Sequence, residues 1–111
     1  MAIDRLRTLL WIQAQMRLCS QKNQPLYIKK KGDPDAGAVF VQLNKLDGAN
    51  ELFTQIRGAE GTLNWVPVSD KISLNDMEVD EYLEKQKEYD PDIWIIEVEV
   101  PNDKFCFIEN A

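Results

Sequence analysis

Apolar side chains recur at three- and four-residue intervals near the start of the chain. This spacing predicts a helix over residues 3–22. The positions expected to face the core are Ile3, Leu6, Leu10, Ala14 and Leu18, with Leu9, Met16 and Cys19 widening the stripe. Asn23, Gln24 and Pro25 follow, and proline disfavours helical dihedrals at the residue before it. We therefore expect this helix to end near residue 22 and to bury one broad face.

Between residues 26 and 68 the pattern changes to short runs in which apolar and polar positions alternate. Alternation with a period of two indicates half-buried strands. The expected strands are 26–29, 38–46, 50–57 and 62–68, and Asp47-Gly48 predicts a tight hairpin between the second and third. Pro67 lacks a backbone donor, so the fourth run belongs at a strand end or a sheet edge. The pattern predicts a four-stranded antiparallel meander.

A second helix is expected from Ser73, with Asp76 completing a loose capping box, to just before Pro91. Its thin apolar stripe consists of Met77, Tyr82, Leu83 and Tyr89. A strand over 93–100 follows, apolar on both faces at its start and acidic on one face at its end, and a turn at 101–103 leads into a last strand at 105–108. The fold class is therefore α+β: an N-terminal helix, the meander, a second helix and a C-terminal β-hairpin.

Length and charge place limits on the protein class. A chain of 111 residues fits one domain over 1–111, and no apolar run is long enough for a membrane span or a signal peptide, which predicts a cytoplasmic location. Residues 1–46 carry eight basic and three acidic side chains, whereas residues 47–111 carry five and sixteen. In one domain such halves are expected to interleave and largely to neutralise each other.

The chain contains no histidine, which excludes Ser-His and Cys-His nucleophiles and removes the usual zinc ligand. Glycine-rich phosphate loops are also missing from the sequence. Cys19 and Cys106 are widely separated, and two buried thiols are preferred over a disulfide between them. The three tryptophans are expected to pack in the core. No cofactor is expected.

Carboxylate chemistry is the remaining catalytic hypothesis. Asp-Pro-Asp occurs twice, and the two loops with their neighbours supply the candidate functional residues Asp33, Asp35, Asp90, Asp92, Trp94 and Glu97. Asp35, Asp92 and Glu97 are the candidate ligands for a divalent cation if the two loops converge. A Pro-Asp, Glu-x-Lys nuclease signature is only partly matched, because Glu99 stands where that signature has lysine. The preferred interpretation of both tripeptides is turn formation, in which the first Asp accepts backbone N–H bonds.

A cluster of lysines offers a second alternative. Lys29, Lys30 and Lys31, together with Lys45, form the candidate basic surface for nucleic acid. A sequence pI near 4.6 argues against nucleic acid, and lysines on an edge strand also discourage edge-to-edge pairing.

Several strings in this chain resemble those of a known family. They are residues 6–11, 32–37, 44–48, 82–86 and 89–94, followed by Glu97. In that order they resemble a family of small, chiefly alphaproteobacterial proteins, domain of unknown function family 1491. The resemblance spans nearly the whole chain and implies a similar fold and a bacterial cytoplasmic setting, without an activity.

The sequence therefore favours a non-enzymatic domain that binds another protein, as a monomer or a small homo-oligomer. A divalent-metal-dependent hydrolase or nuclease is the alternative, and binding of nucleic acid through Lys29 to Lys31 is the second alternative.

Overall fold

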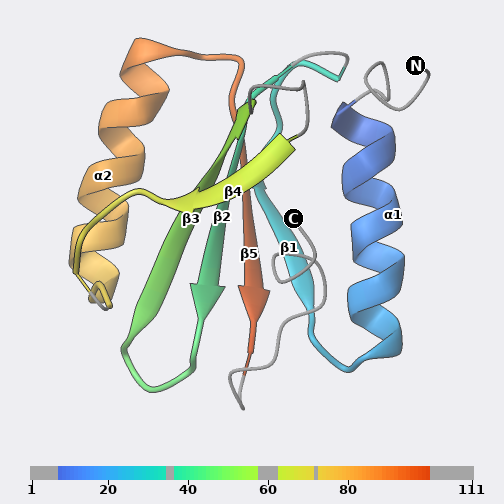
Figure 1. The fold of residues 1–111 in the computed structure, drawn as a ribbon, viewed down its shortest axis with the longest axis horizontal. Helices are drawn as coiled ribbons and strands as arrows, with labels where there is room; N and C mark the ends of the chain where they lie inside the picture. The colour runs from blue at the N-terminus through green and yellow to red at the C-terminus, as the bar shows by residue number, and fades with distance from the viewer. Residues whose placement is uncertain (1–7, 35–36, 58–62, 72, 101–111) are drawn as a thin grey trace.

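A computed structural model describes residues 8–34, 37–57, 63–71 and 73–100 of the protein. Its elements follow the order α1, β1, β2, β3, β4, α2 and β5. Their bounds are α1 Thr8–Gln21, β1 Leu26–Lys30, β2 Val39–Asn44, β3 Asn50–Arg57, β4 Leu63–Pro67, α2 Asp76–Tyr89 and β5 Trp94–Glu99. The sheet lies between the two helices, with α1 on one side and α2 on the other (Figure 1). The α+β fold class is confirmed.

The sheet has the strand order β1-β5-β2-β3-β4. β2, β3 and β4 form an antiparallel meander as predicted, but β1 is not part of it. β5 inserts between β1 and β2, antiparallel to β1 and parallel to β2. β5 can occupy this interior position because Ile93 to Ile96 are buried on both faces. The predicted partner of β5, a last strand at 105–108, lies outside the described residues.

Two apolar clusters separate the sheet from the helices. The cluster under α1 combines Ile12 and Cys19 with side chains of one face of the sheet, among them Val41, Trp94 and Ile96. The cluster under α2 combines Val79 and Leu83 with the opposite face of the sheet. The α2 face of the sheet contributes Phe40, Leu52, Ile93 and Ile95. The predicted alternation along β5 is confirmed, since Trp94, Ile96 and Val98 face α1 and the intervening isoleucines face α2.

The buried stripe predicted for α1 is wrong at Leu10, Ala14, Leu18 and Met16 and correct at Cys19, while Ile3 and Leu6 lie outside the described residues. Leu10 and Leu18 are 50% and 43% exposed, whereas Ile12 and Cys19 are fully buried. Ile12 and Cys19 are two turns apart on the side of the helix opposite Leu10 and Ala14, so the helix is rotated by about half a turn from the expected orientation. The predicted end is confirmed: Asn23 has φ +59°, and Gln24 N–H donates to the Cys19 carbonyl at 2.9 Å in a Schellman arrangement.

α2 begins two residues later than its predicted cap. The capping box uses Asn75 and Glu78 rather than Ser73 and Asp76: Glu78 N–H donates to Asn75 Oδ1, and Asn75 N–H donates to a Glu78 carboxylate oxygen. The N–H and C=O groups of Leu74 form an isolated β-bridge with Asn50, so the helix can begin only after Leu74. The helix ends at Tyr89, just before Pro91, as predicted.

The β2–β3 hairpin forms as predicted, with a wider turn. Asn44 pairs with Asn50, which leaves residues 45–49 in the loop. Positive φ occurs at Leu46 and Gly48, while the Asp47 carboxylate accepts from Ala49 N–H at 3.0 Å. Pro67 is the last residue of the edge strand β4, where its missing donor costs nothing. Neither helix in the described part of the chain has the length and apolar character needed to cross a membrane.

Candidate functional site

The two Asp-Pro-Asp loops lie against each other through their backbones. Asp33 N–H donates to the Asp92 carbonyl at 3.0 Å, and the indole Nε1 of Trp94 donates to the Asp33 carbonyl at 2.8 Å. The Trp94 side chain is buried in the core beneath this junction. The fold therefore brings the loops together, and the contacts that join them are made by peptide groups and an indole.

Two glycines make this close approach of the loops possible. A Cβ atom at Gly32 would lie 2.1 Å from the Asp92 carbonyl oxygen, and one at Gly37 would lie 2.4 Å from the same oxygen. Real Cβ contacts do not occur below 3.0 Å. Both positions must therefore lack a side chain for Gly32 and Gly37 to lie this close to the Asp92 carbonyl.

The same junction supports the start of α1. Leu9 N–H donates to the Pro34 carbonyl at 3.0 Å, and the Thr8 hydroxyl donates to the Gly37 carbonyl at 3.2 Å. In the second loop, Asp92 N–H donates to Asp90 Oδ1 at 2.9 Å, which is the predicted Asx turn. The loops thus tie the first helix to the beginning of β5.

The candidate metal ligands do not all meet. Asp92 lies in the turn before β5, whereas Glu97 lies within β5, so at most about 16 Å of chain separates the two residues. Glu97 instead accepts a bond from Asn44 Nδ2 at 2.8 Å. In the described part of the chain no group of three potential ligands approaches the geometry of a metal site. Asp35 lies outside the described residues, so its position remains a prediction.

Three of the four candidate basic side chains are engaged within the fold. Lys29 Nζ donates to Gln42 Oε1 at 2.9 Å, and Lys45 forms an ion pair with Glu51 at 2.8 Å. Lys30 Nζ donates to the Pro91 and Ile93 carbonyls, which precede β5, at 2.5 Å and 3.2 Å. Lys31 is exposed. These three ammonium groups therefore bond to other residues of the fold and do not form a continuous cationic surface.

A chain of hydrogen bonds crosses the sheet beneath the start of α2. Gln42 Nε2 donates to Asn50 Oδ1 at 2.9 Å, and Asn50 Nδ2 donates to Asp76 Oδ1 at 2.8 Å and to the Leu74 carbonyl at 3.2 Å. Asn50 is fully buried and Gln42 is almost so. Buried amides need such partners, so this chain fixes how α2 enters the sheet.

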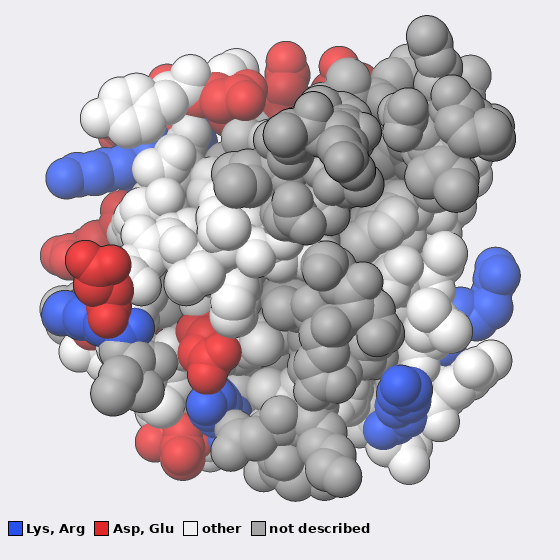
Figure 2. Space-filling view, viewed as in Figure 1, with Lys and Arg blue, Asp and Glu red and all other residues white. Residues whose placement is uncertain are grey.

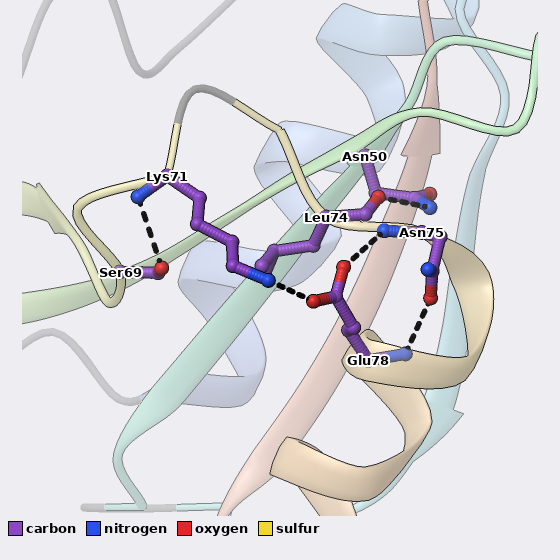
Figure 3. Close-up of polar contacts among 6 residues, drawn as sticks. All are labelled: Asn50, Ser69, Lys71, Leu74, Asn75 and Glu78. Carbon is purple, nitrogen blue, oxygen red and sulfur yellow. Dashed lines mark hydrogen bonds and ion pairs between the residues drawn. The ribbon is translucent and has the colours of Figure 1, made fainter.

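The segment before α2 borders an open hollow of about 430 Å³. Its lining comes from residues 50–53, Pro67, 69–71 and Leu74. Figure 3 shows Lys71 reaching from this segment to Glu78, while Glu78 also closes the capping box with Asn75. The Lys71 ammonium, and then the Asn75 backbone bond, lower the pKa of Glu78 below its ordinary value. Lys71 is thereby occupied in stabilising the helix.

Charge is segregated between the two sides of the sheet. Residues 8–32 contain five Lys or Arg and no carboxylate, whereas α2 contains six carboxylates and two lysines. Figure 2 shows acidic side chains with some basic ones among them over α2, and basic or uncharged described side chains over α1. The two helices lie on opposite faces of the sheet, so the charges of α1 and α2 stay apart (Figure 1), although the two halves of the chain interleave in the sheet and Lys45 of the first half pairs with Glu51 of the second.

The outer face of α1 is the feature that sequence reasoning missed. We define this face as Leu10, Ala14, Arg17, Leu18 and Gln21, which fall within an arc of about 100° opposite Ile12. All five side chains are exposed. Arg17 indicates in the sequence that this face is exposed, because it is the only charged residue of α1 and lies within this arc.

Comparisons with known proteins agree on the fold. The model of the family described as "Protein of unknown function (DUF1491)" matches residues 6–107. A crystal structure of a DUF1491 family protein from Caulobacter crescentus is 29% identical, with a TM-score of 0.80, and the match covers 89% of this chain and 92% of that one. A solution structure of a protein from A. tumefaciens is 22% identical, with a TM-score of 0.76, and the match covers 91% of this chain and 89% of that one. At this level of identity the similarity supports the fold alone. No curated protein matches the chain.

Proposed function

The chain belongs to the DUF1491 family, and we propose that it is a non-enzymatic protein-interaction domain whose binding surface is the outer face of α1. The observation that carries this proposal is the exposure of Leu10 and Leu18, 50% and 43%, on a helix that already buries its opposite side. These leucines flank exposed Ala14 at intervals of four residues, so the three form a continuous apolar stripe.

The surroundings of the stripe support binding to protein rather than to nucleic acid. A phosphate backbone is recognised by many cations, and Arg17 is the single charged side chain of α1. Lysines of the neighbouring β1 strand are used to brace the sheet, as Lys29 does with Gln42. Apolar side chains that a monomer leaves exposed are, by contrast, the usual centre of a protein interface.

The chemistry of the chain supports a non-catalytic role. Its lack of histidine removes the commonest general base. The carboxylates of the second Asp-Pro-Asp loop are exposed, and one oxygen of Asp90 accepts the hydrogen bond of an Asx turn. The work of both loops is structural, since they hold α1 against β5 by backbone bonds.

Comparative affinity capture tests the proposal. The wild-type chain, a Leu10→Asp/Leu18→Asp variant and a Gln13→Asp control are used as bait, because Gln13 is exposed on α1 but lies outside the outer face. We expect a stoichiometric protein, foreign or a second copy of the chain, to be retained by wild type and control and lost by the double variant. Circular dichroism establishes that all three are folded. Equal retention by all three baits, or retention by none, would contradict the proposal.

A further inference from the structure

The outer edge of β1 presents backbone groups that can pair with a further strand. Glu99 N–H donates to the Pro25 carbonyl, and bonded positions alternate along an antiparallel strand. Pro25 and Tyr27 therefore point their peptide groups to β5. Leu26 and Ile28 point theirs away from the sheet. β1 is the first strand of the sheet order, and no strand in the described part of the chain pairs with its outer edge.

The edge at the other end of the described sheet, that of β4, is less suited to pairing. Val68 N–H donates to the Leu52 carbonyl, so the same alternation directs the peptide groups of Trp65 and Pro67 outward. Pro67 has no N–H, which removes a donor from that edge. β1 is therefore the edge that can extend the sheet with regular backbone bonds.

The charge around β1 determines what kind of strand can be added. Residues 8–32 contain five Lys or Arg and no carboxylate. Lys22, Lys29 and Lys31 are exposed before, within and after β1. A second copy of β1 would bring the same lysines together, and like charges across a strand pair are destabilising. The lysines thus disfavour pairing of two copies and favour an acidic strand.

The inner partner of β1 shows which side-chain pattern fits this strand. Apolar and acidic residues alternate along β5: Ile96 and Val98 lie on the α1 side of the sheet, and Glu97, opposite Tyr27, lies on the α2 side. On that α2 side Lys29 Nζ donates to a neutral amide oxygen, so its positive charge is not compensated by this bond. An added strand with the same alternation places its carboxylates beside Lys29.

The α1 side of the same edge is apolar. Trp11 contacts Trp65 of β4, with ring centroids 5.6 Å apart, so this flank of α1 faces the far edge of the sheet. Met16 lies on the opposite flank, about 40° around the helix from the buried Ile12. Met16 is 37% exposed, and Ile28 on the same side of the sheet is only partly buried. Apolar side chains of an added strand would cover both.

We propose that the outer edge of β1 binds an extended segment of another protein as an added strand, with acidic side chains on the α2 side and apolar side chains on the α1 side. Backbone bonds to Leu26 and Ile28 supply the affinity. Lys29 and Lys31 supply the preference for carboxylates. The edge uses none of the residues of the outer face of α1, so this inference goes beyond the proposed function and does not depend on it.

Fluorescence anisotropy with synthetic peptides tests the recognition pattern. The probe is a labelled peptide of three Val-Glu repeats, and the controls have the same composition in two blocks, or lysine in place of glutamate. We expect the probe to bind with a Kd below about 1 mM, at least about tenfold more tightly than either control. Lys31→Glu should weaken binding about fivefold, whereas Lys85→Glu, the same charge change on the exposed side of α2, should weaken it less than about twofold. Equal affinities for the probe and the block peptide, or for the two variants, would overturn the inference.

Hydrogen exchange of the backbone amides locates the bound peptide. With the peptide at ten times its Kd, we expect exchange at Leu26 and Ile28 to slow about tenfold, because their outward N–H groups become bonded. Tyr27, whose peptide group faces β5, is the internal control and should keep its rate. Binding without added protection at Leu26 and Ile28 would contradict the proposed edge.

The Leu10→Asp/Leu18→Asp variant separates this inference from the proposed function. We expect it to bind the Val-Glu peptide as wild type does, because both substitutions lie on the outer face of α1. Loss of peptide binding in this variant would place the peptide on that face and overturn the inference. A wild-type chain that binds no peptide overturns it as well, and affinity capture through the outer face of α1 still decides the proposed function.

Discussion

Replacing Gly32 by alanine tests whether the close approach of the two Asp-Pro-Asp loops holds the fold together. The added Cβ would lie 2.1 Å from the Asp92 carbonyl oxygen and 2.6 Å from the Ile93 carbonyl carbon, both of them backbone atoms. Ordinary contact begins at 3.4 Å, so one of the two loops must move by more than 1 Å. That movement breaks the bond from Asp33 N–H to the Asp92 carbonyl.

The cost follows from these contacts. Overpacking against backbone atoms costs about 3 kcal/mol, the upper end of the usual range, and the lost backbone hydrogen bond costs about 0.5–1.5 kcal/mol more. Alanine offsets roughly 0.4–1 kcal/mol by restricting the unfolded chain. We expect the free energy of unfolding to fall by about 3 kcal/mol, a large part of the roughly 5–15 kcal/mol typical of a domain. The melting temperature should fall by about 12 °C.

Urea denaturation measures this change, with Gly48→Ala as the matched control. Gly48 has φ +88° and no atom within 4 Å of an added Cβ, so its substitution costs only the strain of a left-handed residue, about 1–2 kcal/mol. Gly32 carries no such φ, so any large loss there comes from lack of space. If Gly32→Ala is no more destabilising than Gly48→Ala, the close-approach explanation is refuted.

Four further outcomes are expected. Asn50→Ala should lower the free energy of unfolding by about 2–3 kcal/mol in urea, because the buried Gln42 amide and the Leu74 carbonyl lose their bonds to the fully buried Asn50 side chain, and a loss no larger than that of an exposed Gln13→Ala control would contradict this. Trp94→Phe should cost about 2 kcal/mol by leaving the Asp33 carbonyl without the indole donor, and an unchanged urea midpoint would show that this bond is dispensable. The Lys71 bond lowers the pKa of Glu78 in the folded protein. Ionised Glu78 therefore stabilises the fold at pH values above its unfolded pKa, near 4.5, and this stabilisation disappears as the pH falls through the lower folded pKa. Glu78→Gln should therefore weaken the acid dependence of the melting temperature between about pH 5 and 3, and an identical pH profile would refute that assignment. Millimolar Mg²⁺, Mn²⁺ or Ca²⁺ should leave the melting temperature unchanged, whereas a rise that saturates with one cation would revive the carboxylate site.

Local periodicity was enough to predict most elements. The alternation of β5, from Ile93 and Trp94 to Glu97, correctly gave two apolar faces at its start and one polar face at its end. The end of α1 before Asn23 and the end of α2 before Pro91 were also correct, because helix termination depends on the dihedral preferences of a few adjacent residues.

The candidate site was less predictable. The Asx turn at Asp90 followed from sequence, but nothing local indicated that Gly32 and Gly37 would enclose the Asp92 carbonyl. Asn50 was expected to begin an ordinary strand, yet it organises the buried polar chain beneath α2. Such roles depend on residues distant in sequence, so no local pattern records them.

The sequence by itself determined where helices and strands form and which strand positions are apolar, because backbone preference and periodicity are properties of neighbouring residues. Only the tertiary structure decided that β5 separates β1 from β2 and that the two Asp-Pro-Asp loops meet. It also decided which side of α1 is buried. Two apolar stripes compete on that helix, and packing against the sheet selected the one with Ile12 and Cys19. The other stripe, with Leu10 and Leu18, was left at the surface because a single sheet face can cover only one side of a helix.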